Sequence, residues 1–266
     1  MPLLSLLDDR AKPKGSRDPL GFEQVWTHFG RKVVGNLTTI TGSVENFAVA
    51  LLGFYWAHQL RGGADKDSRE KLVRETFLRY EQVSAYLRYQ AGSRDIMGIT
   101  RVQQAMSQTL AQLPIDLNAQ ILSDQASYGL WGLYSSALKD SGLIEGSERK
   151  PTERGEQLAK DICTGLPDDA FKALFDENGS LAIETCQELA PQYLRAVRSE
   201  EICSRLTHIL LSGEHSDGAH VQSQLFEVTQ KLMKRGDRND EPAITVNEIA
   251  ADATGELEQR LEDIKK

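Results

Sequence analysis

Cysteine and proline are scarce in this 266-residue sequence, and it has no apolar run long enough to cross a bilayer. Its three cysteines share no CxxC spacing, which argues against a disulfide framework and favours a reducing, cytoplasmic setting. The eight prolines stand beside long runs rich in Leu, Ala, Gln and Glu, a composition typical of a mainly α-helical chain. The most apolar stretch, residues 47–56, predicts a buried helix rather than a membrane contact.

Signatures of catalysis, metal binding and nucleotide binding are also missing. The sequence contains no GxxxxGK[ST] loop, no GxGxxG after a strand and no GxSxG elbow. None of the five histidines forms an HExxH or HxH motif or pairs with a cysteine. We therefore expect no metal, no cofactor and no catalytic residue, and a protein that is not an enzyme.

Charge is spread unevenly along the chain, whose net charge is −8. Residues 1–133 carry 15 Lys and Arg against 13 Asp and Glu, whereas residues 134–266 carry 16 against 26. A protein that reads DNA alone usually presents a basic face. Only the N-terminal half supplies one, so the acidic half favours protein contacts.

Turn signals divide the chain into four parts. Residues 1–20 resemble a flexible arm, 21–115 a helical domain, 116–165 a compact module and 166–266 a helical C-terminal region. Apolar periodicity and capping residues predict helices at about 22–33, 43–60, 68–90, 100–112, 168–178, 180–189, 192–212 and 219–234, with another in the last 23 residues.

The module between Ala119 and Cys163 is the most informative stretch. A long helix containing SDQASYGLWGLYSSALKDSG leads into Leu143-Ile144, a polar turn, a second short strand and a helix that starts with a Thr-x-x-Gly pattern. This order is typical of a winged helix, a fold that binds DNA or partner proteins. The aromatic residues of its long helix are core or, where exposed, candidates for a partner surface: Tyr128, Trp131 and Tyr134.

Candidate DNA contacts cluster at the expected wing. Residues 125–140 offer mainly serine and glutamine with one lysine and one aspartate, so that helix is a poor reader of phosphates on its own. Arg149, Lys150 and Arg154 stand at the turn and at the start of the next helix, where backbone phosphates could be reached. The alternative is that Arg149 and Lys150 form a solvated turn.

A second basic surface is expected over residues 61–101, where nine Lys and Arg face six acids. Arg31 and Lys32 could extend it towards the N-terminus. Several of its arginines lie four residues from a glutamate, which is the spacing of ordinary salt bridges on a helix surface. The sequence leaves both interpretations open.

Two segments resemble a known group of bacterial proteins. The sequence GFEQVWTHFGRKVVGNLTTITGSVENFAVALLGFYWA resembles the opening of proteins from phage-defence gene clusters, and QASYGLWGLYSSALKDSGLIEG with KPTERGEQLA is similar to the winged helix that follows in them. The usual Leu-Thr-x-x-Gly start is replaced here by residues 150–155. The resemblance covers under half of the chain. It implies an accessory subunit beside an SMC-like or helicase ATPase and a nuclease, as in Lamassu-type or ABC three-component systems.

The sequence thus predicts a mainly α protein with a helical N-terminal domain, a central winged helix and a helical C-terminal region. The expected role is that of a non-catalytic subunit of an antiphage or DNA-surveillance complex, which bridges an ATPase or nuclease partner and contacts DNA through the complex. One alternative is a dimeric winged-helix transcription regulator, which needs an exposed basic recognition helix. Another is an enzyme with an unrecognised acidic site, which needs several acids around one pocket.

Overall fold

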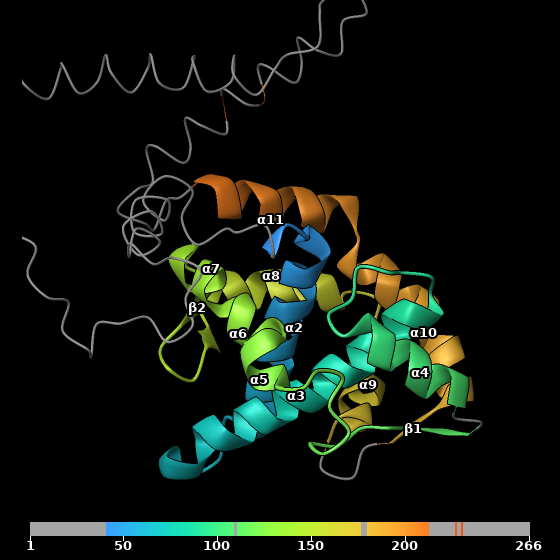
Figure 1. Cartoon of the computed structure of the whole chain (residues 1–266). Coiled ribbons are helices and arrows are strands. Elements are labelled where there is room, and N and C mark those ends of the chain that lie inside the picture. Colours follow the sequence, from blue (N-terminus) through green and yellow to red (C-terminus); the bar gives the residue numbers. More distant parts are fainter. Residues whose placement is uncertain (1–40, 109–110, 177–179, 213–226, 228–229, 231–266) are drawn as a thin grey trace, which may run out of the picture.

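The computed structural model describes residues 41–108, 111–176 and 180–212, together with Glu227 and Gln230, and this part of the chain is mainly α-helical (Figure 1). The fold class predicted from composition is confirmed. The expected arm at 1–20 and the helix at 22–33 lie outside the described residues, as do the helices beyond residue 213 except for Glu227 and Gln230. Among the described helices, none combines the length and apolar character that crossing a membrane requires.

Helix α2 (Val44–Arg61) occupies the centre of the fold, as Figure 1 shows. Ser43 caps it by accepting a hydrogen bond from Asn46 N at 3.4 Å. Phe47, Leu51, Phe54 and Trp56 are buried with their neighbours, because helices α3, α8, α10 and α11 surround α2. The apolar run that predicted a buried helix therefore forms one.

Helix α3 (Lys66–Gln90) packs along α2 and ends where expected. It begins two residues before the predicted Ser68, because the Asp65 side chain is the cap and accepts from Asp67 N at 3.2 Å. Rings join the two helices: Phe54 stacks on Phe77 with centroids 4.4 Å apart. Helix α4 (Ile99–Gln108) is shorter than the predicted 100–112, and strand β1 (Gln112–Pro114) follows it.

The long helix expected before the wing is a wrong prediction. Residues 125–140 form three short helices, α5 (Gln125–Tyr128), α6 (Leu130–Leu133) and α7 (Ser135–Asp140), which are separated at Gly129 and Tyr134. The hairpin that follows was predicted correctly. It consists of β2 (Ile144–Glu145) and β3 (Lys150–Pro151), in which Glu145 pairs with Lys150 and Ile144 with Pro151, and α8 (Glu153–Cys163) comes next.

The last elements close the fold around α2. Helix α9 (Asp168–Leu174) precedes β4 (Ser180–Ala182), an unpredicted strand that pairs antiparallel with β1. Pro191 was expected to open a helix, but it lies inside α10 (Ile183–Val197); the break falls at Arg198 and Ser199, before α11 (Glu200–Ser212). Buried apolar side chains form one continuous cluster from Phe47 to Leu210.

A buried ion cluster ties the start of α2 to two distant parts of the chain. The carboxylate of Glu45 accepts hydrogen bonds from the guanidinium groups of Arg88 on α3 and Arg198 at the end of α10. Arg88 is 2% exposed and also donates to Asn46 Oδ1 at 2.7 Å. A buried charge needs such partners, because desolvation without them costs several kcal/mol.

Candidate nucleic-acid and partner interface

We call the hairpin formed by β2, the turn 146–149 and β3 the wing, after the predicted module. Gly142, just after α7, has the left-handed conformation (φ 67°), and Leu143 N donates back to Leu138 O at 2.9 Å. These two features set the direction in which the hairpin leaves the helix. Within the turn, Arg149 also has a positive φ of 57°, which is uncommon for a residue with a side chain. The contacts of the Arg149 side chain explain why an arginine is held there.

Arg149 folds inwards over the helices instead of extending into solvent. Its guanidinium carbon lies 4.1 Å from the centroid of the Trp131 ring, its Nε donates to Ser135 Oγ at 2.6 Å, and its Nη1 donates to Ser147 O at 3.0 Å. Partial burial lowers the pKa of Arg149. The attraction between a cation and an indole face contributes about 0.5–2 kcal/mol. With the two hydrogen bonds, this contact holds the wing against α6 and α7, which is the main role visible for the Arg149 side chain.

The opposite side of the wing rests on α2 and α3. His58 Nε2 lies 2.9 Å from Glu148 O and donates to it, since a carbonyl can only accept. Arg69 Nη1 lies 4.0 Å from Glu148 Oε2. Burial lowers the pKa of His58. These residues line a small cavity of about 200 Å³ beside Lys150, so the turn is supported from both flanks.

The exit of the wing is fixed by the Thr-x-x-Gly pattern. Thr152 Oγ1 accepts from Gly155 N at 3.2 Å, which caps α8, and donates to Gly142 O at 2.7 Å. Thr152 N also donates to Leu143 O at 3.1 Å. A Cβ on Gly155 would collide with that same Leu143 carbonyl. Both pattern residues therefore join the start of α8 to the segment that leads into β2.

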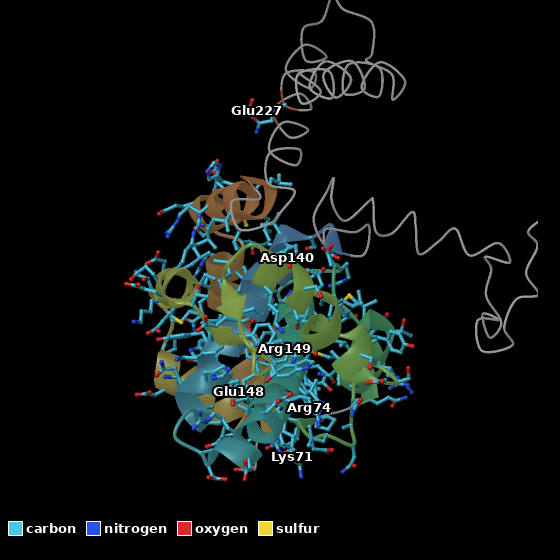
Figure 2. The ribbon with its side chains drawn as sticks, turned by 90° about the vertical axis from the view of Figure 1, so that its left-hand side faces the viewer. Lys71, Arg74, Asp140, Glu148, Arg149 and Glu227 are labelled. Atoms are coloured by element: carbon cyan, nitrogen blue, oxygen red, sulfur yellow. The ribbon has the colours of Figure 1, made fainter. Side chains whose placement is uncertain are left out.

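Positive side chains gather around this hairpin, but acids accompany them. Lys150 is exposed, and Arg154 is partly buried at the start of α8. Figure 2 shows Lys71 and Arg74 of α3 on the same side of the molecule as the wing residues. Arg74 is exposed, whereas Lys71 Nζ lies 3.9 Å from Glu75 Oε1. We call Lys71, Arg74, Arg149 and Lys150 the wing face; Glu70 and Glu148 moderate its charge.

The structure distributes the remaining predicted site residues differently. Arg31 and Lys32 lie outside the described residues. Trp131 is 4% exposed and Tyr134 0%, whereas Tyr128 is 61% exposed. Trp131 packs against Phe77 with ring centroids 5.3 Å apart, so it belongs to the core of this chain. For Trp131 and Tyr134 the partner-surface prediction is corrected, and it remains a prediction for Tyr128.

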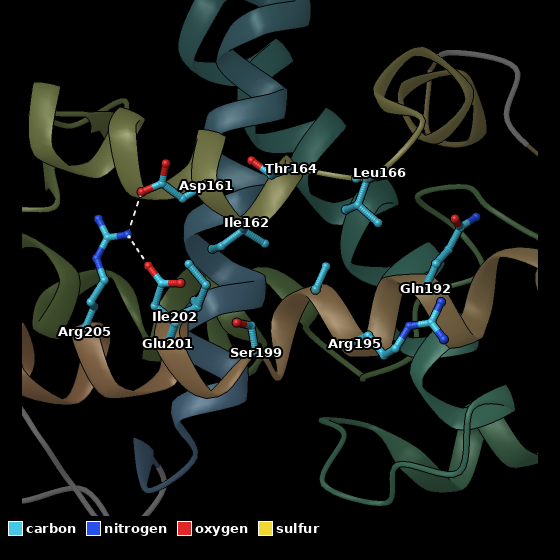
Figure 3. A pocket seen from close by; sticks show the side chains of 12 residues that line it. Asp161, Ile162, Thr164, Leu166, Gln192, Arg195, Ser199, Glu201, Ile202 and Arg205 are labelled. Carbon is cyan, nitrogen blue, oxygen red and sulfur yellow. Dashed lines mark hydrogen bonds and ion pairs between the residues drawn. The ribbon is translucent and has the colours of Figure 1, made fainter.

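A larger hollow lies away from the wing, between the end of α8 and the junction of α10 and α11 (Figure 3). Its volume is about 480 Å³. At one end, Arg205 Nη1 lies 2.6 Å from Asp161 Oδ2 and 3.8 Å from Glu201 Oε1, and the bond with Arg205 lowers the pKa of Asp161. The acids of this hollow are thus neutralised by an arginine and are not arranged around an open centre.

In the described ranges, no group of three or more His, Cys, Asp or Glu could hold a metal ion. The sequence did not reveal the residues that support the wing, His58, Arg69 and Ser135. They lie 90, 79 and 14 positions from their partners, and no local pattern marks such contacts.

Comparisons with protein-family models, with curated proteins and with solved structures give no match to this chain.

Proposed function

We propose that this chain is a non-catalytic subunit of a bacterial antiphage or DNA-surveillance complex. In that role it bridges an SMC-like ATPase or nuclease partner and contacts DNA phosphates through the wing face. The observation that carries the DNA contact is a hairpin supported on both flanks. It carries exposed Lys150 on β3, and exposed Arg74 of α3 lies on the side of the molecule where Arg149 lies (Figure 2). A hairpin that is already ordered loses little conformational entropy when it binds.

The proposal treats α5 to α8 with the hairpin as a winged helix. The order of helices, hairpin and capped helix supports this assignment. In such a module the helix before the wing usually enters the major groove with polar residues. Here α6 and α7 bury Trp131, Ser135 and Leu138. We therefore assign the DNA contact to the wing face and its phosphate-binding cations, without base readout by the preceding helix.

Partner binding follows from the weakness of this contact. Affinity for duplex DNA depends mainly on the number of phosphates that cations neutralise. The wing face offers few cations, and Glu70 and Glu148 lie among them. A complex must add the remaining affinity. The surplus of acids in residues 134–266 supports protein contacts. The same balance disfavours a regulator that acts alone, because such a protein needs an exposed basic recognition helix.

The test has two steps. First, the tagged chain is isolated from a host that carries its neighbouring genes, and co-purifying proteins are identified at moderate salt. A stoichiometric ATPase or nuclease supports the bridging role; a homodimer with no partner that shifts one DNA site contradicts it and favours the regulator.

The second step measures DNA affinity of the recovered complex across salt concentrations. The double change Arg74→Glu and Lys150→Glu should weaken binding at least tenfold and flatten its salt dependence. Arg195→Glu is the matched control, since it reverses an exposed charge on α10 far along the chain from the wing. Equal affinity of the double variant and the control would rule out the wing face as the contact.

A further inference from the structure

Glu81 is a buried acid placed at the break between α5 and α6. It lies in the middle of α3 and is 2% exposed. One carboxyl oxygen accepts from Leu130 N at 2.7 Å, and the other accepts from Gln125 Nε2 at 2.9 Å. The N–H of Leu130 would otherwise bond within a continuous helix. The acid therefore holds the first residue of α6 against α3.

The space beside Gly129 is crowded with acceptor atoms. The two carboxyl oxygens of Glu81 would lie 2.6 and 2.8 Å from a Cβ placed on Gly129, and the carbonyl of Gln125 would contact it too. Because glycine has no Cβ, α5 and α6 can approach the Glu81 carboxyl this closely.

The charges around Glu81 do not offset its burial. The groups that face it from α5 and α6 are the neutral amide of Gln125 and the N–H of Leu130, whose hydrogen bonds favour the ionised form without supplying a compensating charge. Arg88, on α3 itself, is the cation that favours the ionised form, but its bonds go to Glu45, Asn46 and Asp95 O. Burial is the dominant effect and raises the pKa of Glu81 to about 7.

A short series of contacts connects Glu81 to the wing. Leu130 is followed by Trp131, whose ring supports the Arg149 guanidinium and whose carbonyl accepts from Ser135 Oγ. Ser135 Oγ in turn accepts from Arg149 Nε at 2.6 Å. If the start of α6 moves away from α3, the ring beneath Arg149 moves with it.

We propose that Glu81 is a proton-operated latch that couples the docking of α6 on α3 to the order of the wing. With the proton bound, α6 stays docked and Trp131 holds Arg149. Without it, the buried charge favours opening of the joint at Gly129, which lets water reach the carboxylate and releases the wing. This coupling does not depend on DNA or on a partner protein.

The sign follows from proton linkage. The docked state keeps the proton up to about pH 7, whereas an open, hydrated carboxyl loses it near pH 4.5. The open state therefore gains population as pH rises from about 4.5 to 7. Between pH 5.5 and 8 the opening constant should increase on the order of tenfold or more.

Hydrogen exchange of the full chain tests the latch. Protection factors, which remove the intrinsic pH dependence of exchange, are measured at pH 5.5 and pH 8 for residues 125–135 and 146–151. We expect protection of both segments to fall on the order of tenfold, while that of α10 stays constant. Glu81→Gln should remove the pH dependence, and Glu188→Gln, an exposed glutamate on α10, should leave it intact.

Three results would overturn the proposal. They are constant protection of the wild-type chain between the two pH values, a fall that persists in Glu81→Gln, and a fall over residues 125–135 that does not reach the wing. The wild-type comparison needs no variant, so the test holds even if Glu81→Gln folds poorly. Since no DNA is present, the outcome is separate from that of the proposed function.

Discussion

Gly155 illustrates how one side chain can be excluded by a neighbouring backbone. It lies in the first turn of α8, and a Cβ there would meet the carbonyl of Leu143. A backbone atom cannot swing aside as the end of a flexible side chain can. Leu143 O also accepts from Thr152 N, so a shift would disturb the start of the wing.

Gly155→Ala should lower the free energy of unfolding by about 2 kcal/mol or more, since it introduces overpacking against fixed backbone. The measurement is urea denaturation followed by circular dichroism. Gly63→Ala is the control, because no atom lies within 4 Å of a Cβ at Gly63 and its backbone is not left-handed; we expect a change within about 0.5 kcal/mol. Equal stability of the two variants would contradict the close approach.

Helix α10 carries a proline in its interior. Pro191 is exposed, and it cannot donate the backbone hydrogen bond to the carbonyl four residues earlier. The helix nevertheless runs from Ile183 to Val197, because its buried face is anchored in the core through Leu189, Ala190 and Tyr193. The Tyr193 hydroxyl lies 2.6 Å from that of Tyr80 and 2.8 Å from Ser84 Oγ. Packing therefore overrides the local preference.

Pro191→Ala should stabilise the protein by about 1–2 kcal/mol, because alanine restores the missing donor and favours the helix. This gain in stability is smaller than the difference in helix propensity between alanine and proline, since proline also lowers the conformational entropy of the unfolded chain. Thermal unfolding gives the measure, and Glu188→Ala, an exposed change on the same helix, is the reference. Loss of stability in Pro191→Ala would contradict this expectation.

For the whole molecule, the continuous core bears on the predicted division at residues 115 and 165. Buried residues from α2, α3, α6, α8, α10 and α11 belong to one cluster. The ion cluster of Glu45, Arg88 and Arg198 also joins residues on the two sides of these boundaries. We expect the described part to unfold as one unit, although the boundaries themselves remain predictions from sequence.

Glu45→Gln should cost about 3–5 kcal/mol, because it leaves the buried Arg88 guanidinium without its carboxylate. Arg198→Gln should cost less, since that side chain is 46% exposed. Denaturation followed by near- and far-ultraviolet circular dichroism should give coincident transitions in both variants. Separate transitions would instead support independent domains.

Local signals in the sequence predicted the elements that local chemistry controls. Ser43 marks the start of α2, and Thr152 with Gly155 marks the start of α8. The breaks at Gly129 and Tyr134 were missed. At Gly129 the bond that replaces a helical one comes from Glu81, 49 positions earlier. The periodicity of the apolar residues placed Trp131 on one face of a helix. It could not show that the core of the same chain covers that face.

The position of α2 has a consequence for synthesis on the ribosome. This helix is among the first described elements to be translated, yet α10 and α11, which cover part of it, end only at Val197 and Ser212. At about 5–20 residues per second, the wait between the end of α2 and the start of α11 is on the order of ten seconds. During that time the nascent chain carries a strongly apolar segment without its final cover, which makes it a natural client for a ribosome-associated chaperone.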